Sequence, residues 1–562
     1  LADDSSDRFY VLLEKITEHG EELPREFPVA GTTGYDFLDS VNALFVDPIG
    51  LQRLDHFYRK FTGNTATFDD ICYERKKQVI HELFSGEMRG LGKQLGAVAM
   101  PDRNARDFAP VDLTAALTEV TACMRVYRTY IRDAEVAPAD EESIRAAIAE
   151  ARRRAGSTID ERLFTFLERV LLVDPPPYVE SERENWLAFV MRWQQFTGRV
   201  MAKGVEDTAF YNYNRLISLN EVGGDPGRDE FDGLAEFHAR ASQMQQQWPH
   251  TMNATSTHDT KRSEDVRARI NVLSEMAPQW ERQVRRWSKR RGFHDPGAEL
   301  LVYQTLVGMW PLDGDDLPSV RDRLKQYLEK AAREAKTHTS WIAPNPAYEE
   351  SLLGFADSIL SDTAFCEELV LIQKRVAFYG LLNSLSQVVL KAMAPGAPDF
   401  YQGTELWDFS LVDPDNRRPV DYPSRNAMLQ TMKAARSLSI ESLLRRWQDG
   451  RIKMFVTWKV LEARARHAEL FRDGSYEPID VGENIVAFTR RLKGEAIVVA
   501  VPRLMANLLR PGTFPIGNFW PENSIALPGS WRNLFTGENL EGDRIALRSL
   551  FSRFPVAVLD KA

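Results

Sequence analysis

Cysteine and histidine are scarce and widely spaced in this sequence. Three cysteines, Cys72, Cys123 and Cys366, occur among 562 residues without a CxxC pair, and the nine histidines form no HxxxH pair. These spacings argue against a disulfide framework and against a zinc site. No glycine-rich phosphate loop stands before a helix either. We therefore expect a reducing, cytoplasmic setting and no metal or other cofactor.

Positive charge and long apolar runs are also lacking. Lysine and arginine total 71 against 81 aspartates and glutamates, a net charge of −10, so a polyanion is a poor partner. Apolar runs such as AIVVAV at 496–501 stay far below the roughly 18 to 20 residues that span a bilayer. The composition predicts a soluble protein that binds neither nucleic acid nor membrane, and it does not define an oligomeric state.

The length of the chain predicts several domains, three or four at roughly 150 residues each. Residue 1 is leucine rather than methionine, and the opening LADDSSDRF is acidic. These features indicate neither a native start nor a secretory signal. We expect the chain to begin within a longer protein.

The N-terminal part predicts a strand, a turn and a helix. FYVLLEKI at 9–16 is a continuous apolar run, which predicts a fully buried parallel strand with Glu14 at its C-terminal end. GTTGYDFLDSVNALFVDP at 31–48 has two glycines and then apolar residues at helical spacing. This pattern predicts a loop followed by a helix.

Most of the remaining chain has helical periodicity. Apolar residues recur every three or four positions from about 66 to 192 and again from about 262 to 380, which predicts two blocks of amphipathic helices. After about 450, short β-rich runs are separated by Gly, Pro and Asn. These runs predict an antiparallel sheet domain.

Two carboxylates lie where catalytic groups are often found. Glu14 ends a predicted parallel strand, as catalytic groups of α/β folds do, although a surface pair with Lys15 is the simpler interpretation. His258 and Asp259 precede a charged helix start in STHDTKRSEDVRARI. On its own, Asp259 is expected to cap that helix.

Two further segments are irregular and polar. Residues 200–226 interleave Lys203, Glu206 and Asp207 with aromatic residues. Such a mixture suits a sugar, whose hydroxyls need donors and acceptors and whose ring stacks on aromatic faces, and it equally suits an aromatic core. Residues 395–422 are rich in Pro, Gly, Asp and Asn, which predicts a long functional loop after a strand.

Four strings of this sequence, taken in order, resemble one enzyme family. They are GTTGYDFL, MAKGVEDTAFYNYNRLISLNEVGGDP, ATSTHDTKRSEDVRARI and PGAPDFYQGTELWDFSLVDPDNRRPVDY. From about residue 9 to its C-terminal part, the chain resembles the maltooligosyl trehalose synthase family of the α-amylase superfamily (glycoside hydrolase family 13). The resemblance implies an α/β fold: a (β/α)8 TIM-type barrel, here from strand 5 onward, with large helical insertions and a C-terminal antiparallel β-sandwich.

The patterns and the resemblance together predict six segments. Barrel segments are expected at 1–65 (strand 5 onward), 193–261 (strands 6 and 7) and 381–445 (strand 8), helical insertions at 66–192 and 262–380, and the C-terminal β domain at 446–562.

The same resemblance implies roles for the polar residues. Glu14 would be the general acid/base at the end of strand 5, and Asp259 the carboxylate that stabilises the transition state after strand 7. His258 would contact a sugar hydroxyl at the cleavage subsite. Substrate-binding roles are implied for further residues of these motifs: Lys203, Glu206, Asp207, Tyr211, Tyr401 and Gln402.

The sequence departs from the family in its nucleophile. The superfamily places an Asp at the end of strand 4, in a motif like R-x-D-H, upstream of the acid/base. Only 13 residues precede Glu14, and the aspartates at 3, 4 and 7 do not follow an apolar strand. RLDH at 53–56 matches the letters, but it lies downstream of Glu14 within a helical pattern, so Asp55 is excluded. Strands 1 to 4 and the nucleophile are expected to be absent, and the chain by itself should show no turnover.

The activity implied by the resemblance is an isomerisation. A retaining double displacement would convert the reducing-end α-1,4 linkage of a maltooligosaccharide to an α,α-1,1 trehalose linkage. Water competes for the covalent intermediate, so the helical insertions and residues 200–226 are expected to form a lid. Two alternatives remain open: an α-glucan hydrolase or glucanotransferase of the same superfamily, and a non-catalytic maltodextrin-binding fragment.

Overall fold

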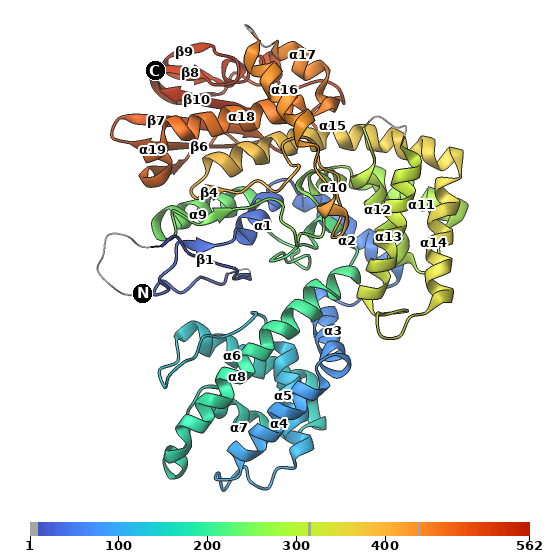
Figure 1. Ribbon diagram of the computed structural model, residues 1–562, viewed down its shortest axis with the longest axis vertical. Coiled ribbons are helices and arrows are strands. Elements are labelled where there is room, and N and C mark those ends of the chain that lie inside the picture. The colour runs from blue at the N-terminus through green and yellow to red at the C-terminus, as the bar shows by residue number, and fades with distance from the viewer. Residues whose placement is uncertain (1–8, 19, 313–315, 436–438, 562) are drawn as a thin grey trace.

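The computed structural model describes residues 9–18, 20–312, 316–435 and 439–561. In this part of the chain the protein is mostly helical, with two short parallel sheets and a larger antiparallel sheet toward the C-terminus (Figure 1). The aspartates at 3, 4 and 7, excluded above as nucleophiles, lie outside the described residues.

Four short strands form the parallel sheets. They are β1 (Leu12–Leu13) with β2 (Gly31–Thr32), and β3 (Met252–Asn253) with β4 (Ala397–Pro398). The Thr32 amide donates to Thr251 Oγ1 at 3.1 Å, which joins the two pairs. Two strands are expected between 193 and 261, but the structure has one there, β3. The strand that pairs with β1 is β2, which lies before this range.

The two glycines of the GTTG turn are required by this junction. A Cβ on Gly31 would lie 2.5 Å from Thr251 Cβ, and one on Gly34 would lie 2.6 Å from the Ala254 amide nitrogen. Both glycines have positive φ, which side chains disfavour. The predicted loop and helix are confirmed, because α1 (Tyr35–Ala43) follows directly, before α2 (Pro48–Thr62).

The predicted strand at 9–16 is wrong in its extent and burial. Only Leu12 and Leu13 pair, and both are half-buried, while Phe9 and Tyr10 are 84% and 58% exposed. Within the described residues β1 has a neighbouring strand on one side only. An apolar run that suits the middle of a parallel sheet is therefore left largely uncovered.

The first helical block is confirmed and has a hydrophobic core of its own. Its helices are α3 (Phe68–Glu82), α4 (Ser85–Ala99), α5 (Pro110–Cys123), α6 (Pro138–Ala155), α7 (Glu161–Leu171) and α8 (Arg183–Met201). A capping box of Thr67 and Asp70 starts α3, and Trp186 and Trp193 of α8 are fully buried. Figure 1 shows this unit extending away from the rest of the molecule.

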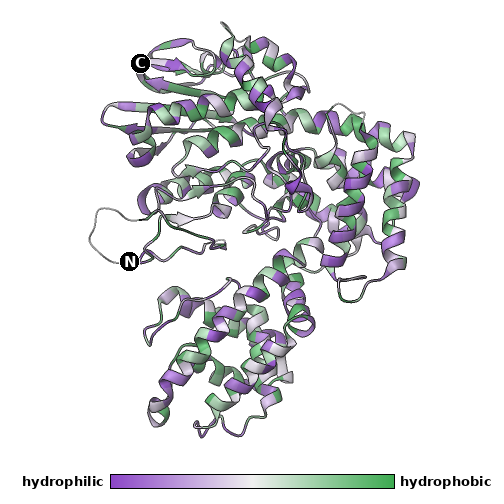
Figure 2. Ribbon diagram, viewed as in Figure 1, coloured by the Kyte–Doolittle hydropathy of each residue, from purple (hydrophilic) through white to green (hydrophobic). Residues whose placement is uncertain are grey.

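The second helical block is also confirmed. After α9 (Gly233–Gln247), its helices are α10 (Glu264–Glu275), α11 (Ala277–Arg291), α12 (Pro296–Met309), α13 (Leu317–Ala335), α14 (Pro346–Leu360) and α15 (Thr363–Met393). Most helices carry hydrophobic and hydrophilic residues on different sides (Figure 2), as the periodicity predicts. Helix α10 differs, because every one of its residues is buried, charged ones included.

Helix α15 is a long apolar helix, although the sequence shows no long apolar run. Its 31 residues are long and apolar enough to cross a membrane, but the apolar window is completely buried inside the protein. Lys374 and Arg375, and then the uncharged polar residues Asn383, Ser384, Ser386 and Gln387, interrupt the apolar residues along the helix, so no continuous run marks it in the sequence. It is a central core helix.

The C-terminal antiparallel sheet is confirmed, with the strand order β5-β6-β7-β10-β8-β9. Its strands are β5 (Ser475–Pro478), β6 (Ile485–Leu492), β7 (Glu495–Pro502), β8 (Ser524–Asn533), β9 (Asn539–Ala546) and β10 (Ala557–Lys561). The neighbouring helices are α16 (Tyr422–Ala434), α17 (Ile440–Arg445), α18 (Arg451–Arg466), α19 (Ala468–Asp473) and α20 (Leu547–Leu550).

The sheet begins later than the sequence suggested, at Ser475 rather than near 450. Helix α18 occupies the intervening residues, and Ile452, Val456, Val460 and Ala463 are buried at helical spacing. The boundaries between domains remain predictions.

Candidate functional site

Glu14 and Asp259 both lie near enough to a buried tyrosine, Tyr35, for their charges to act on it. Glu14 is exposed directly after β1, and Asp259 is exposed in the loop that follows β3. Tyr35 lies at the start of α1, and its hydroxyl is 3.2 Å from Thr257 Oγ1. Burial raises the pKa of Tyr35, and the negative charges of Asp259 and Glu14 raise it further. The structure thus brings together two carboxylates that are 245 positions apart in the sequence.

The simpler interpretations of both carboxylates are wrong. Lys15 is buried and forms its ion pair with Glu21, so it is not the surface partner of Glu14. Asp259 does not cap α10, because the N-cap residue is Ser263. The Asp259 amide donates instead to Thr257 Oγ1 at 3.1 Å, within a short turn.

The segment after α8 is a broken helix, as predicted. A π-helical turn (Ala202–Glu206) follows α8, and a 3-10 turn (Ala209–Tyr211) comes next. Gly204 allows this turn to pack on α3, because a Cβ there would lie 2.7 Å from Lys76 Cγ and 2.9 Å from Lys76 Cα. The aromatic residues of this segment, Tyr211 among them, are buried, and the role of Tyr211 in binding remains a prediction.

Asp207 is held between two lysines. Lys203 Nζ lies 2.5 Å from Asp207 Oδ2, and Lys261 Nζ lies 3.0 Å from Asp207 Oδ1. Although burial opposes the shift, the charges of Lys261 and Lys203 lower the pKa of Asp207. Lys203 is half-exposed and Lys261 is buried. This arrangement keeps a carboxylate and an accessible ammonium group side by side.

Glu206 has the opposite character. Its side chain is buried, and burial raises its pKa to about 8. The charge of Lys261 opposes this shift, while those of Asp207 and Asp259 add to it. Glu206 is therefore mostly protonated at neutral pH and can donate a hydrogen bond.

The loop after β4 is confirmed as irregular and approaches the same place. Tyr401 donates from its hydroxyl to the Asn416 carbonyl at 3.2 Å, and Asn416 Nδ2 donates to the His258 carbonyl at 3.0 Å. His258 and Gln402 are exposed. Tyr401 is thus connected through Asn416 to the backbone of His258.

Asp55 lies within helix α2, as the sequence predicted. It pairs with Arg59 at 2.7 Å and with Arg215 at 3.4 Å. These contacts give it a structural role.

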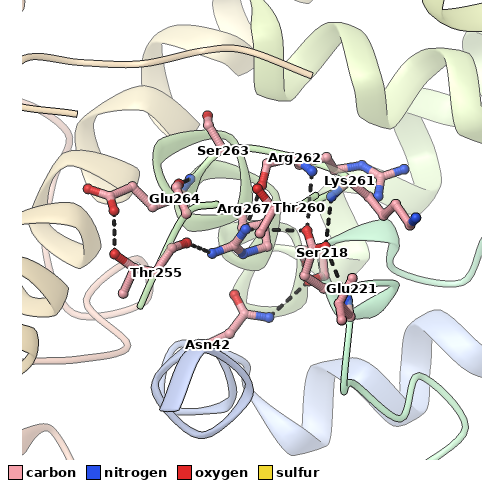
Figure 3. Close-up of polar contacts among 12 residues, drawn as sticks. Asn42, Ser218, Glu221, Thr255, Thr260, Lys261, Arg262, Ser263, Glu264 and Arg267 are labelled. Carbon is pink, nitrogen blue, oxygen red and sulfur yellow. Dashed lines mark hydrogen bonds and ion pairs between the residues drawn. The ribbon is translucent and has the colours of Figure 1, made fainter. Parts of the chain in front are cut away.

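Sequence reasoning missed the buried charges that surround the loop between β3 and α10. Lys261, Arg262, Glu264 and Arg267 are each at most 4% exposed, and Figure 3 shows them around the loop together with Glu221 and Thr255. A run of alternating charges usually marks a solvated helix face. Val266, Ile270 and Leu273 recur at helical spacing in the same segment, so the sequence carried no signal that the charged residues are buried as well.

Comparison with models of protein families finds none that matches the chain. Among curated proteins, it is 34% identical over 555 residues to the "Putative maltooligosyl trehalose synthase" of Mycobacterium tuberculosis. The chain is homologous to the maltooligosyl trehalose synthases. Maltooligosyltrehalose synthase from Arthrobacter ramosus has a similar structure, with a TM-score of 0.83, 33% identity and 98% of this chain covered. A hypothetical maltooligosyl trehalose synthase from Sulfolobus tokodaii matches with a TM-score of 0.76 and 30% identity, also over 98% of this chain.

The match covers less of these relatives than of this chain. Each match includes 98% of this chain. It covers 65% of the Mycobacterium tuberculosis protein, 66% of the Arthrobacter ramosus synthase and 65% of the Sulfolobus tokodaii protein. The resemblance inferred from four sequence strings is confirmed over nearly the whole chain.

Proposed function

We propose that this chain carries the acid/base and the transition-state carboxylate of a maltooligosyl trehalose synthase. The substrate would be a maltooligosaccharide, and the reaction would convert its reducing-end α-1,4 linkage to an α,α-1,1 linkage. The observation that carries the proposal is that Glu14 and Asp259 are exposed after the parallel strands β1 and β3, near enough to Tyr35 for both charges to raise its pKa, together with the homology to these synthases.

The proposal includes the finer fold. We take β1, β2, β3 and β4 as strands 5 to 8 of a (β/α)8 barrel, because both pairs are parallel and the Thr32 to Thr251 bond joins them in that order. Glu14 follows β1 and Asp259 follows β3. Catalytic groups of such barrels lie at the carboxyl ends of the strands.

In this mechanism Glu14 transfers a proton twice. As the anomeric carbon is attacked, the C–O bond to the terminal glucose breaks and the leaving oxygen takes a proton from Glu14. The freed glucose turns, and Glu14 removes the proton of its anomeric hydroxyl as that oxygen attacks the anomeric carbon of the covalent intermediate and the bond to the nucleophile breaks. Asp259 would stabilise the positive charge that develops on the sugar ring. The proposal assigns the attacking nucleophile to no residue of this chain.

The remaining polar residues would hold the sugar. The accessible ammonium group of Lys203 and the neutral carboxyl group of Glu206 supply donors, and Asp207 supplies an acceptor. His258, exposed beside Asp259, would contact a hydroxyl of the ring at the cleavage point. Tyr401 and Gln402 would contact sugar units farther along.

The assay is the reducing power of maltopentaose. We expect the chain by itself to bind maltopentaose without changing its reducing power, because no nucleophile is assigned to it. In a polypeptide that joins this chain to strands 1 to 4 of the barrel, with an Asp nucleophile at the end of strand 4, we expect reducing power to fall, and Glu14→Gln to abolish the fall. Lys15→Gln, next along the chain but paired with Glu21, serves as the control.

Other outcomes favour the alternatives. If the joined polypeptide raises the reducing power of maltopentaose, it is a hydrolase. If it binds maltopentaose and leaves the reducing power unchanged, its role is maltodextrin binding. Robust turnover by the chain itself would place the nucleophile within it.

A further inference from the structure

The loop that presents His258 and Asp259 is bonded to the rest of the protein at its two ends and, at its tip, by the Tyr35 hydroxyl at 3.2 Å from Thr257 Oγ1 and by Asn416 Nδ2, which donates to the His258 carbonyl at 3.0 Å. Two further bonds at the tip are local: the Thr257 amide donates to Thr260 Oγ1 at 3.3 Å, and Thr260 Oγ1 donates to the Thr257 carbonyl at 3.0 Å. These bonds shape the turn. They do not set where the turn lies relative to Glu14.

Glu221 binds the end of the loop that follows Asp259. Its carboxylate accepts the Lys261 amide at 2.7 Å and the Arg262 amide at 3.2 Å. Glu221 is 1% exposed, so these bonds are shielded from water. Hydrogen bonds to an ionised carboxylate are stronger than those between neutral groups.

Arg267 binds both ends of the same loop. One guanidinium nitrogen donates to the Thr255 carbonyl, before His258, and another donates to the Arg262 carbonyl at 2.5 Å, after Asp259. The planar guanidinium suits such a bridge, because its donors have a fixed geometry. Arg267 is 2% exposed and lies on α10, which is itself completely buried.

The two side chains form one unit. Glu221 Oε2 lies 3.3 Å from Arg267 Nη1, and Figure 3 shows the pair at the base of the loop. Between them they contact four backbone groups on the two sides of the loop. A buried ion pair adds little stability on balance, but it defines one arrangement of the groups around it.

We propose that Glu221 and Arg267 are positioning residues, which hold the loop so that His258 and Asp259 face a sugar beside Glu14. This inference rests on the proposed role of Asp259. Glu221 and Arg267 touch neither the reacting atoms nor the sugar, and they act through the loop backbone.

The test substitution is Glu221→Gln, which keeps the size and removes the charge. A glutamine amide has one acceptor oxygen, and its NH2 group would face backbone amides or the Arg267 guanidinium, which are also donors. The two amide bonds to the loop cannot both survive. Arg267→Lys is the second variant, because a single ammonium group cannot span the Thr255 and Arg262 carbonyls in the same way.

Glu275→Gln is the control for a conservative change of a buried carboxyl group on the same helix, where burial raises the pKa to about 8 and the charge is mostly absent at neutral pH. Glu275 lies on the same helix, is 4% exposed and accepts the Ala506 amide at 2.6 Å. That bond joins α10 to the C-terminal part of the chain and involves no residue of the loop.

Two measurements decide the proposal. We expect amide hydrogen exchange at Lys261 and Arg262 to accelerate by about tenfold or more in Glu221→Gln and Arg267→Lys, since each loses bonds to a charged group. We expect the Kd for maltopentaose to rise by about tenfold as the loop loses its position. Glu275→Gln should change neither quantity.

Each other result has a defined meaning. Unchanged exchange in Glu221→Gln, or faster exchange with an unchanged Kd, overturns the positioning role. An equal loss of affinity in Glu275→Gln also overturns it, because the effect would then be one of general stability. A wild-type chain that does not bind maltopentaose contradicts the proposed function, while the exchange data still decide whether Glu221 and Arg267 hold the loop.

Discussion

The free energy of unfolding of the Glu206→Gln variant, compared with that of the wild type, should increase as the pH rises. Glu206 is 7% exposed, and burial raises its pKa from an ordinary value near 4.5 to about 8. A raised carboxyl pKa means that the folded state holds the proton more tightly than the unfolded state. The resulting stabilisation is complete below about pH 4.5 and is lost as the pH rises through 8.

The size of the effect follows from the pKa. Between pH 6 and pH 8 the unfolded carboxyl group is already ionised while the folded one keeps its proton. Stability then falls by about 1.4 kcal/mol per pH unit. Over the interval from pH 6 to pH 9, Glu206 should cost the wild type about 3 kcal/mol. Glu206→Gln does not titrate, so its stability relative to the wild type should rise by that amount.

Urea unfolding at pH 6 and pH 9, followed by circular dichroism, measures the difference. Glu275, another buried carboxyl group with a raised pKa, is present in both proteins and cancels. The charge of Glu206 contributes to the raised pKa of Glu18, so the substitution also lowers the pKa of Glu18 and adds to the gain at high pH. Glu477→Gln, which changes an exposed carboxylate in β5, should differ from the wild type equally at both pH values. A Glu206→Gln difference that stays constant or falls with pH would refute the reasoning.

Two further substitutions test packing and the excluded nucleophile. Gly50→Ala should destabilise the protein by roughly 3 kcal/mol or more, because its Cβ would lie 1.8 Å from the Ser274 carbonyl oxygen of α10. As the control, Gly96→Ala in α4, whose Cβ would meet nothing within 4 Å, should be neutral or stabilising by up to about 1 kcal/mol. Equal melting temperatures for the two variants would contradict this packing. Asp55→Asn should lower the melting temperature by removing the ion pairs with Arg59 and Arg215, yet leave the Kd for maltopentaose unchanged; a weakened Kd would return Asp55 to the site.

The helical blocks could be predicted because their signal is local. Helices such as α7 bury one face, with Leu163, Phe164, Leu167 and Val170 at intervals of one, three and four residues, so periodicity alone identifies them. The antiparallel sheet was found for the same reason. The strand pairs were harder to predict, since β1 and β4 are two residues long and the partner of β4 begins at Met252, far away in the sequence.

Part of the candidate site could not be predicted, because its burial depends on the whole fold. The motifs identify Glu14 and Asp259 as candidate site residues, but nothing in the sequence marks Lys261, Glu221 or Arg267 as part of the site. Charged side chains are almost never fully buried unless they are paired, and the pairs here join residues up to 54 positions apart. Only the folded arrangement reveals that these charges surround the loop.

Helix α15 links the candidate site to the C-terminal sheet. Asn383 donates to the Ala268 carbonyl of α10, while Ser386 donates to the Pro502 carbonyl at the end of β7. Gly380 lies so close to α10 that a Cβ would be 3.0 Å from Arg269 Cα. These contacts lie within two turns of α15, so the same short stretch of this buried helix packs against the sheet and against the helix that carries Arg267. The C-terminal sheet is therefore part of the support on which the loop with Asp259 is built.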